Sequence, residues 1–157
     1  MKKKMLIIVA LIVVLGIGLV ALTGCVADNE ELSSDGRKKE SFYELKYVEP
    51  KEYSSDSDFE ENRDITKYYF YGQYEGSINL TCNKGKDYSE VENLFYNEHT
   101  EKIINGTTWR VMDDNSSNTK SRFYYTVHNN DLYLIELNGI DKYQNEMDEF
   151  IKNVSFK

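Results

Sequence analysis

Apolar and polar residues alternate along several short stretches of this chain, which predicts β-strands. Three such stretches precede residue 83: Phe42–Val48, Thr66–Tyr74 and Ile78–Cys82. Four more form two pairs, 101–104 with 107–113 and 121–128 with 131–137. The turns between the paired stretches are Asn105-Gly106 and Asn129-Asn130. Asn and Gly tolerate the positive φ of a type I′ turn, so both pairs are predicted to be hairpins.

Two stretches have the periodicity of an amphipathic helix. Asp87–Asn97 carries one apolar stripe, and Asp141–Val154 carries a second one with Asp141 as the expected N-cap. The second stripe consists of Tyr143, Met147, Phe150, Ile151 and Val154. Ser54–Asp64 is polar and acidic and is predicted to be a loop. The expected order is therefore βββ-α-ββββ-α.

The predicted strand at 131–137 has apolar residues on both of its faces. Tyr133, Ile135 and Leu137 share one face, while Leu132 and Leu134 share the other. A sheet that is apolar on both faces must be covered on both. We therefore expect an α+β fold in which a largely antiparallel sheet is flanked by helices on both faces, an α/β/α sandwich.

The chain begins with a basic segment followed by a long apolar run. Lysines occupy positions 2 to 4, and the 18 residues Met5–Leu22 include no polar side chain. This arrangement is typical of an export signal, although 18 apolar residues also reach the lower limit for a transmembrane helix. The residues at the end of the run discriminate between the two.

Leu22, Thr23, Gly24 and Cys25 follow directly on the apolar run, and this tetrapeptide resembles the lipobox of bacterial lipoproteins. The resemblance implies cleavage after Gly24, a diacylglycerol thioether on Cys25 and often a further acyl chain on the new N-terminus. Two acyl chains are what stable anchoring requires. We thus expect a signal peptide at 1–24, a lipidated Cys25 with a flexible tether at 25–41, and one globular domain at 42–157. An uncleaved membrane helix with an incidental cysteine is the alternative.

Charge limits the partners of the exported part. The whole chain has a net charge of −8, and removal of 1–24 takes away three lysines and no acid, leaving −11. Such an acidic domain is repelled by an anionic bilayer and by nucleic acid. We expect the acyl chains to hold the protein on the outer side of the cell membrane, and the domain to meet an envelope or extracellular protein whose identity the sequence leaves open.

Within residues 42–157, the element order and hairpin positions resemble the PsbP-like fold. The matching segments are Lys102–Trp109, Phe123–Tyr125, Tyr133–Leu137 and Val154–Phe156. The resemblance implies a non-enzymatic binding or accessory module that needs no cofactor. Fold similarity by itself does not identify a partner.

Few residues in the chain offer catalytic or metal chemistry. The two histidines, His99 and His128, are not accompanied by a nucleophile motif, and we assign no catalytic residue. The acidic groups 56–64 and 113–115 lack the spacing of a calcium loop, so we assign no metal ligand either. Cys82 is expected to be a buried apolar residue on a strand.

The favoured function is that of a membrane-anchored extracytoplasmic lipoprotein that binds a partner without turnover. Two alternatives remain open. One is a small-ligand binder with a pocket between sheet and helix, lined by some of the chain's 13 tyrosines. The other is a hydrolase that uses Asp113 and Asp114 as a carboxylate pair, which requires one of them to have a raised pKa.

Overall fold

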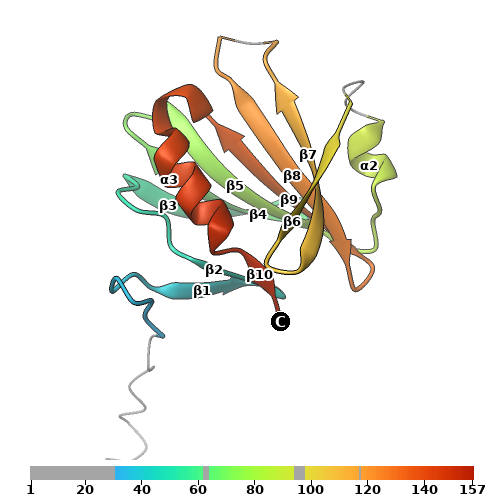
Figure 1. Cartoon of the computed structure of the whole chain (residues 1–157), viewed down its shortest axis with the longest axis horizontal. Coiled ribbons are helices and arrows are strands. Elements are labelled where there is room, and N and C mark those ends of the chain that lie inside the picture. The colour runs from blue at the N-terminus through green and yellow to red at the C-terminus, as the bar shows by residue number, and fades with distance from the viewer. Residues whose placement is uncertain (1–30, 62–63, 94–97, 117) are drawn as a thin grey trace, which may run out of the picture. The chain divides into compact units, whose positions relative to one another are not determined.

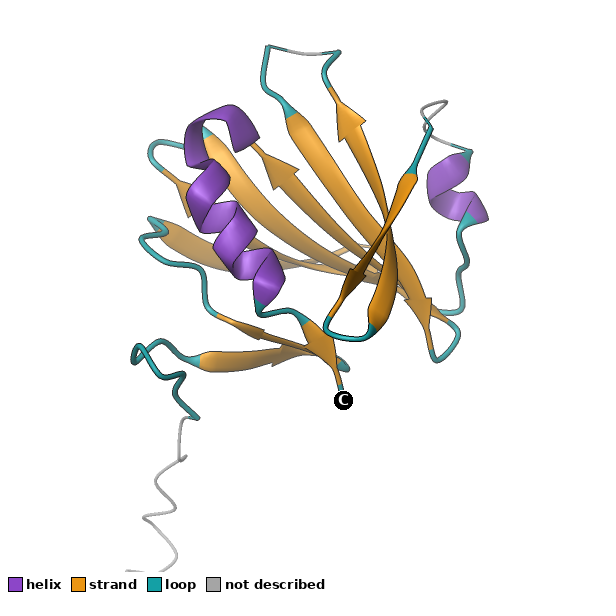
Figure 2. Cartoon of the chain, in the orientation of Figure 1, coloured by secondary structure: helices purple, strands orange, loops and turns teal. Residues whose placement is uncertain are grey.

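The fold consists of two antiparallel sheets and two helices in the part of the chain described by the computed structural model, residues 31–157 without 62–63, 94–97 and 117 (Figures 1 and 2). Leu32–Lys157 form one compact unit, separate from Met1–Glu31. The strands are β1 (Lys39–Phe42), β2 (Leu45–Val48), β3 (Ser55–Glu61), β4 (Asp64–Tyr71), β5 (Gly76–Asn83), β6 (Thr100–Ile104), β7 (Thr107–Asp114), β8 (Ser121–His128), β9 (Asp131–Asn138) and β10 (Ser155–Phe156). The helices are α2 (Ser89–Glu92) and α3 (Ile140–Lys152). Neither is long and apolar enough to cross a bilayer.

The larger sheet has seven strands in the order β3-β4-β5-β9-β8-β7-β6, and all of its neighbours are antiparallel. The smaller sheet has the order β1-β2-β10, so it joins the N-terminal hairpin of the domain to its last strand. Both predicted hairpin turns are confirmed. Asn105 and Gly106 have φ of 47° and 83°, and Asn129 and Asn130 have φ of 48° and 68°, as type I′ turns require.

One face of the large sheet is covered by α3 together with the small sheet (Figure 1). Side chains of β4, β5 and β9 meet Leu45 and Tyr47 from β2 and Phe150 from α3 in this core. The Tyr47 and Phe150 rings lie 5.5 Å apart, and the phenol oxygens of Tyr47 and Tyr69 are 2.9 Å apart. As predicted, Ile78, Leu80 and Cys82 point into it and have no exposed surface.

The opposite face carries a second, smaller core beneath α2. Val91 of α2 packs there with Met112, Phe123, Tyr125 and Leu132 from β7, β8 and β9. Nearer to β4 this face is mixed: it carries Thr66 and Thr81, whose hydroxyls are 3.0 Å apart, beside the stacked rings of Tyr68 and Phe70. Among the described residues, the buried apolar cluster of this face therefore lies beneath α2.

The expected α/β/α sandwich is wrong, because the described part of the chain is mostly β and its helices form no layer over the second face. The residues predicted to be a loop at 54–64 instead supply β3, a polar edge strand paired with β4. Polar side chains are common on edge strands because they discourage further pairing. Of the helix predicted at 87–97, α2 covers only four residues, and 94–97 lie outside the described part. The antiparallel pairing and the apolar stripe of α3 are confirmed, since Met147, Phe150, Ile151 and Val154 are buried.

Order begins earlier in the chain than we expected. Leu32 pairs with Lys38 in an isolated bridge, and Arg37 donates to Glu149 of α3 at 2.5 Å. The stretch expected to be one strand from residue 42 to 48 instead holds the end of β1, the turn of the β1–β2 hairpin, and β2. Tyr43 has a φ of 55° in this turn. Much of the predicted tether is thus part of the folded domain.

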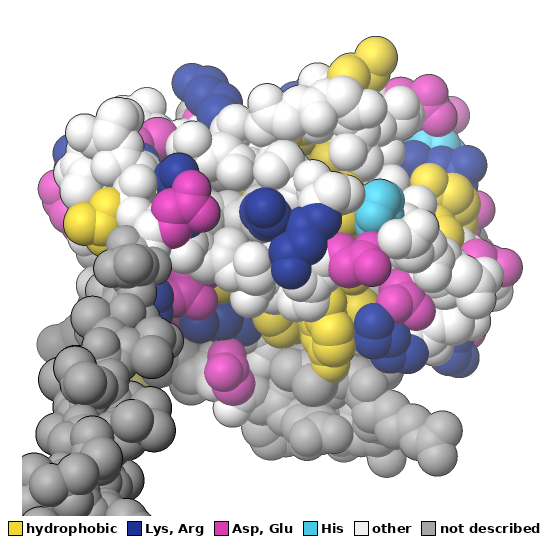
Figure 3. All heavy atoms as spheres, turned by 90° about the horizontal axis from the view of Figure 1, so that it is seen from below, with side chains coloured by type: hydrophobic (Ala, Val, Ile, Leu, Met, Phe, Trp, Pro, Cys, Tyr) yellow, Lys and Arg dark blue, Asp and Glu magenta, His cyan; other side chains and the backbone are white. Residues whose placement is uncertain are grey.

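Charges of both signs lie side by side on the side of the domain that carries β1, β2 and β10 (Figure 3). Lys38 is 2.6 Å from Glu40, and Nε2 of His128 is 3.2 Å from Glu44. This surface therefore carries no extended field of a single sign.

Candidate functional site

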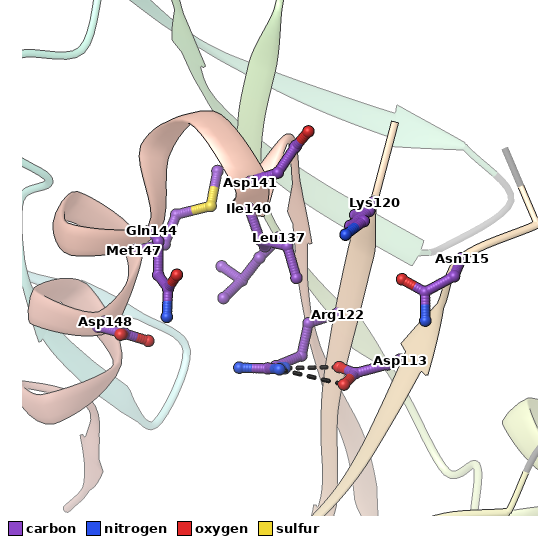
Figure 4. Close-up of a pocket in the computed structure, with 10 residues that line it drawn as sticks. All are labelled: Asp113, Asn115, Lys120, Arg122, Leu137, Ile140, Asp141, Gln144, Met147 and Asp148. Carbon is purple, nitrogen blue, oxygen red and sulfur yellow. Dashed lines mark hydrogen bonds and ion pairs between the residues drawn. The ribbon is translucent and has the colours of Figure 1, made fainter. Parts of the chain in front are cut away.

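A cavity of about 450 Å³ lies between residues 140–148 of α3 and the adjoining ends of β7, β8 and β9 (Figure 4). We call it the α3 cavity. Its walls are formed by Asp113, Asn115, Lys120, Arg122, Leu137, Ile140, Asp141, Gln144, Met147 and Asp148. Ligand pockets in proteins usually have volumes of 300–1,000 Å³, so this cavity suits a small molecule.

Backbone contacts fix the helix wall of the cavity to its strand wall. The carbonyl of Lys120, just before β8, accepts hydrogen bonds from the N–H groups of Gly139 (3.0 Å) and Ile140 (3.2 Å). Gly139 has a φ of 78°, and a Cβ at this position would lie 2.7 Å from the carbonyl oxygen of Glu75. Glycine is therefore required where the chain turns from β9 into α3. The helix begins at Ile140 after this glycine, so Asp141 is not the N-cap that we predicted.

An arginine held by a carboxylate forms the centre of the strand wall. Asp113 and Arg122 are register partners on β7 and β8, and Nε and Nη2 of Arg122 donate to the two Asp113 oxygens at 2.5 and 3.1 Å. The hydrogen bond from Arg122 is the main reason why the pKa of Asp113 lies below its usual value. The pair stays ionised near neutral pH. The free end of the guanidinium points across the cavity towards α3 (Figure 4).

Other polar side chains on the rim of the cavity have no such salt bridge. Among the residues that the structure describes, no hydrogen bond or ion pair involves the side chains of Lys120, Gln144 or Asp148. Beneath them, Leu137 and Met147 are each only 1% exposed and form an apolar floor. The cavity thus combines an apolar base with polar groups that are available to a ligand, and its lining is more polar than that of most small-molecule sites, which favours a polar ligand.

The carboxylate pair of the hydrolase hypothesis is not assembled. Asp113 and Asp114 are neighbours on β7, so their side chains point to opposite faces of the sheet. Asp114 accepts the backbone N–H of Ser116 at 2.8 Å, and hydrogen bonding to Ser116 lowers the pKa of Asp114. Neither carboxyl has the raised pKa that a general acid needs.

The tyrosines are divided between the two faces of the large sheet. Tyr69 and Tyr71 of β4 are buried in the core, whereas Tyr68 and Phe70 lie on the opposite face with their rings 5.7 Å apart and nearly parallel. None of the residues that line the α3 cavity is a tyrosine. A cavity between sheet and helix is present, as the small-ligand hypothesis expects, but its lining differs from the one we predicted.

The other residues singled out from the sequence do not form a site in the described part of the chain. Leu22, Thr23, Gly24 and Cys25 lie outside it. Cys82 is buried on β5, as predicted. His128 stacks on Phe156 with ring centroids 4.1 Å apart. Among the described residues, no three His, Cys, Asp or Glu side chains are placed to hold a metal ion.

Sequence reasoning missed Lys120, Arg122, Gln144 and Asp148. The pairing of Asp113 with Arg122 could have been found by counting outward along the β7–β8 hairpin, but its register depends on the long loop at 115–120. The approach of Gln144 and Asp148 to that hairpin depends on how α3 packs on the sheet.

Comparisons with known proteins do not add a family. No family model matches the chain, and no curated protein is significantly similar to it.

Proposed function

We propose that this protein is a lipid-anchored lipoprotein on the outer side of a bacterial cell membrane, and that its domain binds a small polar ligand in the α3 cavity without transforming it. The α3 cavity is the observation that carries the binding part of the proposal. It offers an apolar floor and unengaged polar groups on a framework fixed by backbone hydrogen bonds. Because the backbone framework and the Arg122 side chain are already held in place, a ligand has to order only the remaining polar side chains when it binds.

The cysteines support the anchoring part of the proposal. The chain has two of them, and Cys82 is enclosed in the core with no exposed surface. Cys25 follows the apolar run and completes the sequence Leu-Thr-Gly-Cys. A lipid attached to a thiol of the folded protein therefore belongs on Cys25.

Metabolic labelling with a tagged palmitate tests the anchor. We expect the wild type and Cys82→Ala to carry the label and to fractionate with membranes, and Cys25→Ala to lose the label. Retention of the label by Cys25→Ala would refute lipidation at this residue.

A thermal-shift screen of small polar metabolites tests the binding site. A ligand present at 100 times its Kd stabilises the protein by about 2.7 kcal/mol, which raises the melting temperature by several degrees. Gln144→Tyr fills the cavity and should abolish the shift. Asn145→Tyr adds the same bulk at the next, exposed position of α3 and should retain it. A ligand whose shift survives Gln144→Tyr binds elsewhere, and that result would refute the assignment to this cavity.

A further inference from the structure

The two walls of the α3 cavity carry opposite charges. Lys120 and Arg122 stand on the strand wall, at the start of β8. Asp148 stands on the helix wall with Gln144 one turn before it. Figure 4 shows the Arg122 guanidinium and the Asp148 carboxylate facing each other across open space, with Leu137 between the walls.

The strand wall is suited to a carboxylate. A guanidinium has five N–H donors. Asp113 accepts from two of the nitrogens of Arg122 and the Tyr124 hydroxyl is a further partner, which still leaves donors for a ligand. The salt bridge also fixes the orientation of this side chain, which reduces the entropy lost on binding. Because Asp113 neutralises Arg122, the uncompensated positive charge of this wall comes from Lys120.

The helix wall is suited to an ammonium group. Asp148 is partly buried, and no described cation is paired with it. Gln144 adds a carbonyl oxygen that can accept a further N–H bond. The third acid of the rim, Asp141, points away from Arg122 and leaves Asp148 as the carboxylate that faces the strand wall (Figure 4).

We infer that the α3 cavity binds a small zwitterion, an α-amino acid or a short peptide, with its carboxylate towards Lys120 and Arg122 and its ammonium towards Asp148. A ligand with a single charge leaves one wall uncompensated, and such unpaired charge is costly in a partly enclosed site. A volume of about 450 Å³ admits an amino acid or a dipeptide, and Leu137, Ile140 and Met147 can contact its apolar part. This inference rests on the proposed function, because it names the ligand class of the same cavity.

Calorimetric titration of the purified lipidated protein with the free L-amino acids and a set of dipeptides tests the inference. For the tightest binder, two derivatives are then compared: the N-acetyl form, which lacks the ammonium, and the C-terminal amide, which lacks the carboxylate. We expect each derivative to bind at least about 10-fold more weakly than the parent zwitterion, the factor that corresponds to about 1.4 kcal/mol.

Two variants assign the charges to the walls. Asp148→Asn should weaken the zwitterion about 10-fold and leave the N-acetyl form unchanged, whereas Lys120→Gln should weaken the zwitterion and leave the amide unchanged. Glu146→Gln removes an α3 carboxylate that does not line the cavity and should alter neither affinity.

Two results would overturn the inference. One is that no amino acid or dipeptide binds at millimolar concentration, and the other is that a derivative with one charge binds as tightly as the zwitterion. In either case the binding function would still stand if the thermal-shift screen found another ligand that Gln144→Tyr excludes. If that screen also found none, both proposals would fail.

Discussion

The side chain of Asn105 connects the β6–β7 turn to the C-terminal end of α3. Its Nδ2 donates to the carbonyl oxygens of Lys152 at 2.9 Å and Val154 at 2.8 Å. The last carbonyls of a helix have no partner within the helix. Asn105 therefore has two functions, because it also adopts the positive φ of 47° that the turn requires.

Two substitutions separate these functions. Asn105→Gly keeps the positive φ and removes both hydrogen bonds, each with a net value of about 0.5–1.5 kcal/mol. Since the Asn105 side chain is exposed, we take the lower part of this range and expect the free energy of unfolding to fall by about 1–2 kcal/mol. Asn105→Asp places a carboxylate against two carbonyl oxygens at the negative end of α3, which costs about 0.3–1 kcal/mol more.

Urea unfolding followed by the fluorescence of Trp109 measures both effects. Trp109 is the chain's one tryptophan and is 1% exposed in the core, so its emission reports the folded state. With a slope of about 2 kcal/mol/M, Asn105→Gly should lower the midpoint by about 0.5–1 M, and Asn105→Asp should lower it further.

Asn130 provides the control, because it also has a positive φ and its side chain makes no described hydrogen bond. Asn130→Gly should change the stability by less than about 0.5 kcal/mol. If Asn105→Asp proved as stable as Asn105→Gly, the two carbonyls would not be the partners of this side chain, and the reasoning would be refuted.

Three further predictions concern the core and the charges. A Cβ on Gly76 would lie 2.5 Å from the Tyr143 ring, so Gly76→Ala should cost about 1–3 kcal/mol in thermal unfolding, and an unchanged melting temperature would contradict this. The hydrogen bond from Lys84 holds the pKa of Asp131 below 3.8, so the stabilisation by this pair is complete above pH 4 and is lost as the pH falls through the lowered pKa. Asp131→Asn should therefore reduce the free energy of unfolding at pH 7 and flatten its decline below pH 4, as measured by urea titrations. An acid profile that the substitution leaves unaltered would exclude this role. In Cys25→Ala, Cys82 should react with a thiol reagent only after unfolding, and rapid labelling of the native protein would show that the core opens there.

Local patterns allowed several elements to be predicted from the sequence. Asn105-Gly106 specified a turn type because few residue pairs accept two positive φ angles. The stripe from Met147 to Val154 specified the buried face of α3 because its spacing matches the helical repeat. In both cases the information lies within a few residues of the element itself.

The errors arose where distant parts of the chain decide the structure. Ser55–Glu61 has little apolar character, and it is a strand because β4 offers it an edge to pair with. The apolar residues Leu132 and Leu134 did imply that this face is covered, but they did not imply a helical layer, since the buried cluster they belong to is small and is covered by α2. The lining of the α3 cavity was missed for the same reason, because Arg122 and Asp148 come together only through packing.

The order found in residues 32–41 changes how freely the domain can move if Cys25 is acylated. The bridge between Leu32 and Lys38 and the contact between Arg37 and Glu149 make the chain part of the folded domain from Leu32 onwards. Seven peptide units therefore separate Cys25, which would carry the thioether, from the folded domain. Seven units extend to about 25 Å at most. The near side of the domain would then stay within about that distance of the membrane, and a ligand would be captured close to the membrane surface.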